Sequence, residues 1–456
     1  MKARHRSTII VTRHLDIIKT ANGNILRGPN DVMERWRQYF EQTFNEEFPH
    51  PPIPFVKRVQ GPVLPVAPAE VANQCGFVKD CGTIDAIHAA RLLVERHREK
   101  NRSVHLAFLD LEKAFDCVPR ELIWMSLRKH GVPEEYVRWI KLLYQKPSSV
   151  VRCSAGTSKR FPIEVGVHQG SVLSPLLFIL CVDTITGDIQ KPHPWCLLYV
   201  DDVMLAAETR EDLQAEVQLW KDRLQQYGLR LNIEKTEYME CGPRIEDGTI
   251  CVDGKDLKKV ECFKHLGSRI ASTGDILSDA LGRANAAWMK WRTTTGILFD
   301  KKMPIRLKSK VYRTVVRPVA LNGTECWAAT KAAKQVLHTM ELRMLRWSIG
   351  VTLKDKVPNE VVRSTFGVAP IADKMREARL CWFGHVCRRV DKSVAKTALN
   401  LNVKGTRPRG RPKIRWLDCV KSDMAEVQLT TRDADNRNKW RRRCSTADPA
   451  TTWYKR

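Results

Sequence analysis

The sequence predicts an α+β protein in which a region of mixed strands and helices precedes a long, basic, helical region. Residues 104–110, VHLAFLD, alternate as a half-buried strand does, with every second side chain on one face. Residues 195–207 hold two short apolar runs around an Asp pair, which predicts a β-hairpin. Four later segments have a helical pattern and are rich in Lys and Arg: residues 276–300, 304–320, 331–349 and 372–390.

The composition favours a globular protein with a polyanionic partner. The chain has 456 residues, 43% hydrophobic and 28% charged, enough for two or three domains. Its formal net charge of +26 favours nucleic acid as the partner, with an anionic membrane as the alternative. No apolar run approaches the ~20 residues that a spanning helix needs, and the N-terminus does not resemble a secretory signal. We therefore expect a soluble intracellular protein without a membrane segment.

The fourteen cysteines are scattered and form no CxxC pair, which favours buried thiols in a reducing compartment over a disulfide framework. One group, Cys381, His385 and Cys387, has residue types that bind metals. Its spacing is irregular and its segment reads as a helix, so core thiols compete with a structural zinc site there.

In chain order, the sequence predicts five segments. They are a basic, partly helical N-terminal segment (1–48), a Pro-rich linker (49–72), the mixed α/β region (73–275), a helical region (276–400) and a basic tail (401–456). Within the mixed region we expect helices at 83–98, 119–131, 134–145, 171–186 and 209–228. The last of these begins with a capping-box pattern at Thr209 and Asp212 and ends at Gly228.

The stretch CLLYVDDVML (196–205) sets Asp201 and Asp202 side by side between apolar runs. Two adjacent carboxylates at a hairpin turn repel each other, and burial raises their pKa. A divalent cation removes that cost, and Mg²⁺ prefers carboxylate oxygen. A solvated Asp-Asp turn is the alternative interpretation.

A third carboxylate favours the metal interpretation. Asp110 ends the strand of AFLDLEKAFD, 91 residues before Asp201. Two metal ions bridged by carboxylates from separate segments stabilise the attacking and leaving oxygens of an in-line phosphoryl displacement. Between these segments lies GVHQGSVLSP (166–175), a loop that runs into a helix, and such a helix start offers free N–H groups to a phosphate.

The blocks around these residues resemble those of reverse transcriptases from non-LTR, LINE-type retrotransposons, the RTE-like group in particular. FLDLEKAFDCVPRELIW, GVHQGSVLSPLLFIL and LLYVDDVML resemble the first, second and YxDD blocks. GLRLNIEKTEYM (228–239) resembles the fourth block, CFKHLGSRI (262–270) the primer grip, and QCGFVKDCGTIDAIHAARLL (74–93) the segment before them. The resemblance implies a right-hand polymerase palm, an antiparallel sheet with packed helices, followed by a helical thumb and a basic helical C-terminal region.

The resemblance also implies an activity, RNA-directed DNA synthesis on template RNA and primer DNA from dNTPs. It implies two Mg²⁺ ions, for which Mn²⁺ can substitute, held by Asp110, Asp201 and Asp202. Lys235 would protonate or steady the leaving pyrophosphate, although a solvated surface Lys is an alternative there.

Further roles follow from the matched positions. Phe115 would lie under the sugar and exclude a 2′-OH, with a plain core Phe as the alternative. Contacts to the nascent base pair would come from Gln169, Gly170 and Ser171. The primer end would pack against Phe263, Lys264, His265, Leu266 and Gly267.

The sequence departs from the family in three places. Ala72 is followed directly by Asn73, so the segment that would carry the fingers is too short, which predicts a deletion or a gene-model join. The family's N-terminal endonuclease is also missing from the sequence, and Cys117 stands where Arg is common. A truncated product that binds RNA or DNA without polymerising is therefore the alternative function.

The basic tail contains RPRGRPK (407–413), which resembles an AT-hook core. Arg407, Arg409 and Arg411 would lie in a narrow minor groove, and a plain basic linker is the alternative. Helices with Arg306 and Lys310 resemble a thumb that grips the template–primer backbone. The resemblance implies a nuclear protein with a cytoplasmic ribonucleoprotein phase, and it leaves the oligomeric state open.

Overall fold

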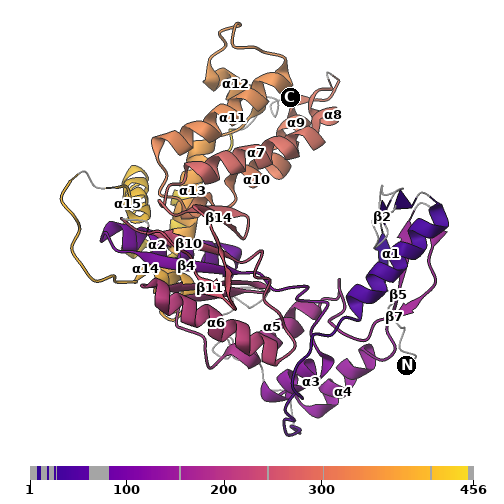
Figure 1. Cartoon of the computed structure of the whole chain (residues 1–456). Coiled ribbons are helices and arrows are strands. Elements are labelled where there is room, and N and C mark those ends of the chain that lie inside the picture. The colour runs from indigo at the N-terminus through magenta and orange to yellow at the C-terminus, as the bar shows by residue number, and fades with distance from the viewer. Residues whose placement is uncertain are drawn as a thin grey trace. The chain divides into compact units, whose positions relative to one another are not determined.

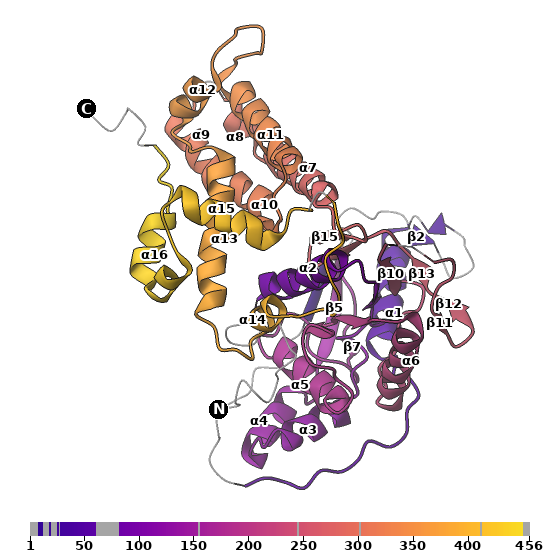
Figure 2. The same ribbon diagram turned by 90° about the vertical axis from the view of Figure 1, so that its left-hand side faces the viewer.

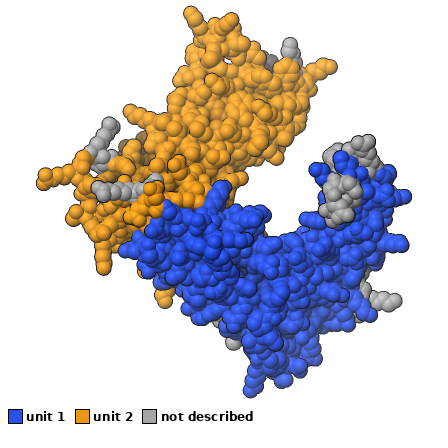
Figure 3. All heavy atoms as spheres, in the orientation of Figure 1, with its two compact units in different colours: residues 1–82, 106–238, 248–258 blue, residues 83–105, 239–247, 259–456 orange. Residues whose placement is uncertain are grey.

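The computed structural model describes residues 8–11, 18–19, 25–26, 28–60, 82–153, 156–243, 246–300, 302–410 and 413–449. The chain forms two compact units (Figure 3). Unit 1 comprises residues 1–82, 106–238 and 248–258, and unit 2 comprises residues 83–105, 239–247 and 259–456. The predicted 72/73 junction and most of the QCGFVKDCG stretch lie outside the described residues.

The largest sheet has five strands in the order β13-β10-β4-β9-β8. Figure 1 labels its strands β4 and β10. Its strands are β4 (Val104–Leu109), β8 (Cys196–Tyr199), β9 (Asp202–Ala207), β10 (Glu237–Cys241) and β13 (Lys258–Lys259). All six residues of β4 are buried, so this predicted strand is covered on both faces. β8 and β9 pair antiparallel, with Tyr199 opposite Asp202, which confirms the predicted hairpin.

The helices of unit 1 cover this sheet and build its core. They are α3 (Arg120–Lys129), α4 (Glu134–Leu143), α5 (Ser174–Thr186) and α6 (Arg210–Gln226). α5 packs against α3 and α6, and α6 packs on β9. On one face of α6 an apolar stripe of Leu213, Val217, Trp220 and Leu224 is buried, and the Asp212 N–H donates to Thr209 Oγ1 over 3.2 Å as the predicted cap requires.

The N-terminal residues join a second, smaller sheet of unit 1. β1 (Thr8–Val11) pairs parallel with β5 (Ser148–Cys153), and β5 pairs antiparallel with β6 (Gly156–Thr157) and β7 (Phe161–Pro162). α1 (Pro29–Phe44) lies in the segment that the sequence predicts to be partly helical. It contacts β5 and β7 through a small core of Trp36, Phe40, Phe44, Val151, Phe161 and Ile163. The minor pairs are β2 (Ile18–Lys19) with β3 (Ile25–Leu26) and β11 (Cys251–Val252) with β12 (Lys255–Asp256).

Unit 2 is mostly helical. It contains α2 (Thr83–Glu99), the hairpin of β14 (Cys262–His265) and β15 (Ser268–Ala271), α7 (Leu277–Thr293), α8 (Thr295–Leu298), α9 (Ile305–Val311), α10 (Arg317–Leu321), α11 (Lys331–Ile349), α12 (Asn359–Phe366), α13 (Ile371–Cys387), α14 (Val394–Leu399), α15 (Trp416–Glu426) and α16 (Arg437–Cys444). One π-helical turn (Tyr312–Val316) links α9 to α10, and 3₁₀ turns occupy Thr324–Cys326 and Thr431–Asp435. The four predicted basic helices are all present.

Two packed groups of helices account for the core of unit 2 (Figure 2). α7 packs against α10 and α11. The core of this group includes the buried side chains of Trp291, Trp327 and Leu337. α14 packs on α2, and α13 contacts α15 and α16. The α+β class predicted from the sequence is therefore confirmed. The structure describes no helix long and apolar enough to span a bilayer, and every cysteine that it describes carries a free thiol.

Candidate active site

The candidate site is built on the end of β4 in unit 1. Asp110 directly follows this buried strand, and its side chain is 43% exposed. A neighbouring loop holds its backbone on both sides: the Asp110 N–H donates to Thr236 Oγ1 over 3.3 Å, and its carbonyl accepts from the Asn232 N–H at 2.8 Å. The strand and this loop together fix the point at which the Asp110 carboxylate leaves the sheet.

The second part of the site is the β8–β9 hairpin. Only Val200 and Asp201 separate the paired residues Tyr199 and Asp202. Val200 has φ +60°, a left-handed conformation that a β-branched residue adopts only under strain. Such tight turns usually take Asn or Gly at this position. The strained valine keeps the turn at two residues, so that Asp201 and Asp202 both stand at its tip.

The electrostatics of the site reflect three like charges. Partial burial, then the neighbouring carboxylates of Asp201 and Asp110, raise the pKa of Asp202 to about 6. Burial and the Asp110 carboxylate likewise raise the pKa of Asp201. In the part of the chain that the structure describes, no cation forms an ion pair with Asp201 or Asp202. Negative charge thus gathers on two segments, and among the described residues only Lys235 forms an ion pair with one of these carboxylates, Asp110.

Lys235 stands beside this cluster. Its Nζ lies 4.0 Å from Asp110 Oδ2, and its side chain is 71% exposed. Its backbone N–H donates to Asn232 Oδ1 over 3.2 Å, which ties it to the loop that holds Asp110. Its position near the carboxylates fits the predicted proton donor. Its high exposure fits the alternative, a solvated surface Lys, so the role of Lys235 stays a prediction.

The geometry stops short of a closed metal cage. Among the described residues, no group of three or more His, Cys, Asp or Glu side chains is close enough together to hold a metal ion. The carboxylates of Asp110 and Asp201 act electrostatically on Asp202, and carboxylate oxygens are the donors that Mg²⁺ prefers, although the three side chains do not converge on one point. The same finding gives no support to a zinc site at Cys381, His385 and Cys387.

The loop before α5 crosses the residues that follow Asp110. Gly166 has φ +79°, and a Cβ on it would lie 2.4 Å from the Asp116 carbonyl oxygen, so only glycine fits there. The close crossing is fixed by the Val167 N–H, which donates to the Phe115 carbonyl over 2.8 Å. Gln169 Nε2 donates to Asp116 Oδ1 over 2.6 Å, and the ring of Phe115 stacks on Phe178 with centroids 4.9 Å apart.

The structure thus brings Phe115 and Gln169 to one place in unit 1. Gly170 has φ +78° and open space around it, and the Ser171 N–H donates to the His168 carbonyl over 3.1 Å. Phe115 is only partly buried and packs against the core of unit 1, which includes Phe178. Their contacts with substrate stay predictions.

The predicted primer-grip residues form the tight hairpin β14–β15 of unit 2. Its turn residues Leu266 and Gly267 have φ +49° and +82°. Lys264 is exposed, whereas His265 is buried and burial lowers its pKa to about 4. Asp279 on α7 anchors the hairpin: its carboxylate accepts from the Ser268 hydroxyl at 2.7 Å and from the Arg269 N–H at 2.8 Å.

Two features of these sites carry little sequence signal. Asp279 appears in the sequence as one acidic residue in a basic helix, because its partners lie far along the chain. The strain at Val200 has a weak signal, namely a valine where a two-residue turn favours Asn or Gly.

The residues predicted to bind nucleic acid lie in the loop before α15. Arg407 Nη2 donates to the Lys413 carbonyl over 3.0 Å, and Arg409 is exposed. Arg411 lies outside the described residues.

Part of the chain matches a known protein family. The family described as reverse transcriptase (RNA-dependent DNA polymerase) matches residues 57–270. The chain is 28% identical over 222 residues to a retrovirus-related Pol polyprotein from the type-2 retrotransposable element R2DM of Drosophila melanogaster, covering 45% of this chain and 21% of that protein. It is 23% identical over 292 residues to an RNA-directed DNA polymerase from the mobile element jockey of the same species, covering 60% and 31%.

The chain therefore spans about a fifth to a third of the length of these relatives. Among solved structures, a telomerase from Candida albicans covers 64% of this chain and 53% of its own, with 10% identity and a TM-score of 0.37.

Proposed function

Because residues 57–270 carry a reverse transcriptase domain of the non-LTR retrotransposon type, we propose that this chain extends a DNA primer on an RNA template. The proposal rests chiefly on one observation. The carboxylates of the strand-end Asp110 and of the hairpin residue Asp201 lie close enough to Asp202 for each of them to raise its pKa. Nucleotidyl transfer needs such an arrangement of carboxylates from separate segments.

In this proposal, Asp110, Asp201 and Asp202 hold two Mg²⁺ ions. The ions would neutralise the triphosphate and polarise the oxygens that attack and leave. The site favours cations because it holds three carboxylates. Among the described residues, the one positive charge that pairs with them is Lys235 Nζ, 4.0 Å from Asp110 Oδ2.

The remaining residues position substrates. The exposed Lys235 can reach the leaving pyrophosphate and donate a proton to it. Gln169, Gly170 and Ser171 would contact the nascent base pair, and the partly buried Phe115 ring would meet the sugar and exclude a 2′-OH. The β14–β15 hairpin would support the primer end, with Asp279 as its positioning residue.

A second candidate function is nucleic-acid binding without polymerisation. The charge of +26 supports it, and so does the lack of a closed metal cage among the described residues. Binding would then rest on backbone contacts that are independent of sequence and sensitive to salt.

Primer extension separates the two candidates. The assay uses an oligo(dT) primer on poly(rA) with Mg²⁺ and then Mn²⁺, and compares the wild type with the Asp201→Asn/Asp202→Asn double variant. Glu208→Gln, which changes an exposed acid at the end of β9, is the matched control. We expect extension by the wild type and the control and none by the double variant. If the wild type folds and binds the duplex but adds no nucleotide, only the binding function remains.

A further inference from the structure

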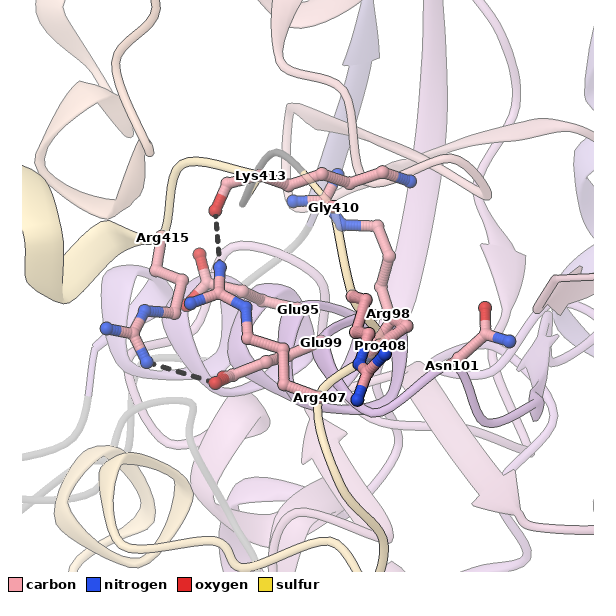
Figure 4. A pocket seen from close by; sticks show the side chains of 10 residues that line it. Glu95, Arg98, Glu99, Asn101, Arg407, Pro408, Gly410, Lys413 and Arg415 are labelled. Atoms are coloured by element: carbon pink, nitrogen blue, oxygen red, sulfur yellow. Dashed lines mark hydrogen bonds and ion pairs between the residues drawn. The ribbon is translucent and has the colours of Figure 1, made fainter.

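The loop before α15 and the C-terminal half of α2 enclose a small cavity in unit 2. We call the described loop residues, 404–410 and 413–415, the tail loop. The cavity has a volume of about 120 Å³ (Figure 4). It is lined by Glu95, Arg98, Glu99, Asn101, Arg407, Pro408, Arg409, Gly410, Lys413 and Arg415. Five of these side chains are cationic and two are anionic, so the lining carries a net charge of +3.

Both carboxylates of the lining are already engaged in anchoring the loop. Arg415 Nη1 donates to Glu99 Oε1 over 3.0 Å, and the Trp416 N–H at the start of α15 donates to Glu95 Oε2 over 2.7 Å. Upstream of the loop, Arg96 Nη2 donates to the Leu399 carbonyl over 2.9 Å. The tail loop is therefore attached to α2 near both of its ends.

Apart from Arg415, the cations of the lining form no ion pair with a described residue. Arg407 donates to the Lys413 carbonyl, as Figure 4 shows, and Arg98 donates to the Thr273 carbonyl over 2.7 Å. Neither contact neutralises a charge. Arg409 and Lys413 are exposed, and neither forms an ion pair within the described part of the chain. Four positive groups thus surround a cavity whose acids already have donors.

The size and the charge of the cavity indicate which kind of ligand fits it. Its volume is well below the ~300–1,000 Å³ of pockets that hold drug-sized ligands, so it can take a single small anionic group. Guanidinium groups match phosphate oxygens in geometry as well as in charge. Burial raises the pKa of Glu95 to about 7, so the floor of the cavity carries less negative charge near neutral pH than two free carboxylates would.

We propose that Arg98, Arg407, Arg409 and Lys413 form a binding site for a backbone phosphate of a nucleic acid strand. The tail loop is held against α2, with Arg407 turned back to the Lys413 carbonyl. It therefore reads backbone charge and does not insert as an extended strand into the minor groove. The proposal rests on the proposed function only in taking nucleic acid as the ligand.

Fluorescence anisotropy on the full chain tests this site. Labelled AT-rich and GC-rich duplexes of equal length, and a single-stranded RNA, are titrated between about 50 and about 200 mM salt. The variants are Arg409→Ala and Lys413→Gln. Lys404→Ala is the matched control, because Lys404 is exposed on the same loop but does not line the cavity. An unchanged melting temperature confirms that each variant is folded.

We expect each cavity variant to reduce the salt slope of duplex binding by about 0.9, equally for both duplexes, and by about 0.7 for the single strand. The control should leave the slope unchanged. An equal loss in Lys404→Ala would mean that the tail acts as diffuse charge, and a loss confined to the AT-rich duplex would mean minor-groove binding. Either result overturns the proposal. Because no dNTP is present, the outcome is independent of whether the chain polymerises.

Discussion

The buried carboxylate of Asp279 gives the sharpest stability prediction, because its side chain is only 1% exposed and satisfies four donors. Arg91 Nη2 lies 2.6 Å from Oδ2, and the Trp327 indole N–H donates to the same oxygen over 2.9 Å. The Ser268 hydroxyl also donates to Oδ2, and the Arg269 N–H donates to Oδ1. One side chain thus joins α2, the β14–β15 hairpin, α7 and the segment after α10.

The expected cost of Asp279→Ala follows from these contacts. Removing one partner of a buried ion pair leaves the other charge uncompensated and costs about 3–5 kcal/mol. Arg91, whose side chain is 9% exposed, would be that charge. For a unit of this size, such a loss lowers the melting temperature by roughly 6–20 °C. Asp279→Asn keeps the volume and one acceptor, so it should lie near the lower end of that range.

Urea unfolding of the full chain, followed by tryptophan fluorescence, measures the effect. Asp275→Asn, an exposed acid two residues before α7, is the matched control and should stay within about 0.5 kcal/mol of the wild type. In a double-mutant cycle with Arg91→Met, the coupling energy should exceed about 1 kcal/mol. If Asp279→Asn unfolds at the same urea concentration as the control, the reasoning about this carboxylate is wrong.

Three further predictions concern pH and selectivity. Because the pKa of Asp202 is raised to about 6, the rate of primer extension at limiting Mg²⁺ should fall as the pH drops through 6. More Mg²⁺ should move this loss to lower pH, and a pH midpoint independent of Mg²⁺ would contradict the assignment. Phe115→Ala should raise incorporation of rNTP relative to dNTP by at least about tenfold in single-nucleotide assays, whereas unchanged selectivity would leave Phe115 a core residue. Burial between two Trp rings lowers the pKa of His88 to about 3. Below pH 6.5 the unfolded chain therefore binds a proton that the folded chain does not, and the stability of the fold should decline as the pH falls. In urea unfolding measured across pH, His88→Phe should flatten this decline, and an equal decline in the variant would rule His88 out as its source.

The parts of the fold that depend on local pattern could be predicted from the sequence. The apolar run before Asp110, the hairpin around Asp201 and the stripe of α6 each repeat with the period of the element that they form. The approach of Asp110 to the hairpin was also predicted, because the spacing of the blocks resembles a known family.

The parts that depend on distant pairing could not be predicted in this way. β1 joins β5 across about 140 residues of chain, and Arg91 meets Asp279 across 188 residues. Local periodicity carries no information on which distant segment supplies a partner. The same holds for His88, which the sequence shows only as one histidine in an apolar helix although Trp382 and Trp416 enclose it. The sequence shows the tail loop only as a basic stretch that resembles an AT-hook core, and its attachment to α2 through Arg415 and Glu99 emerges only in three dimensions.

The central claim is that Asp110, Asp201 and Asp202 together bind the divalent ions of a polymerase. Counting Mn²⁺ ions by electron paramagnetic resonance, on the chain with a 3′-deoxy primer, template and dTTP, tests it most directly. We predict two bound ions for the wild type and a loss of at least one in Asp110→Asn, while the affinity for the primed template stays the same. Equal Mn²⁺ binding by the two proteins would contradict the claim.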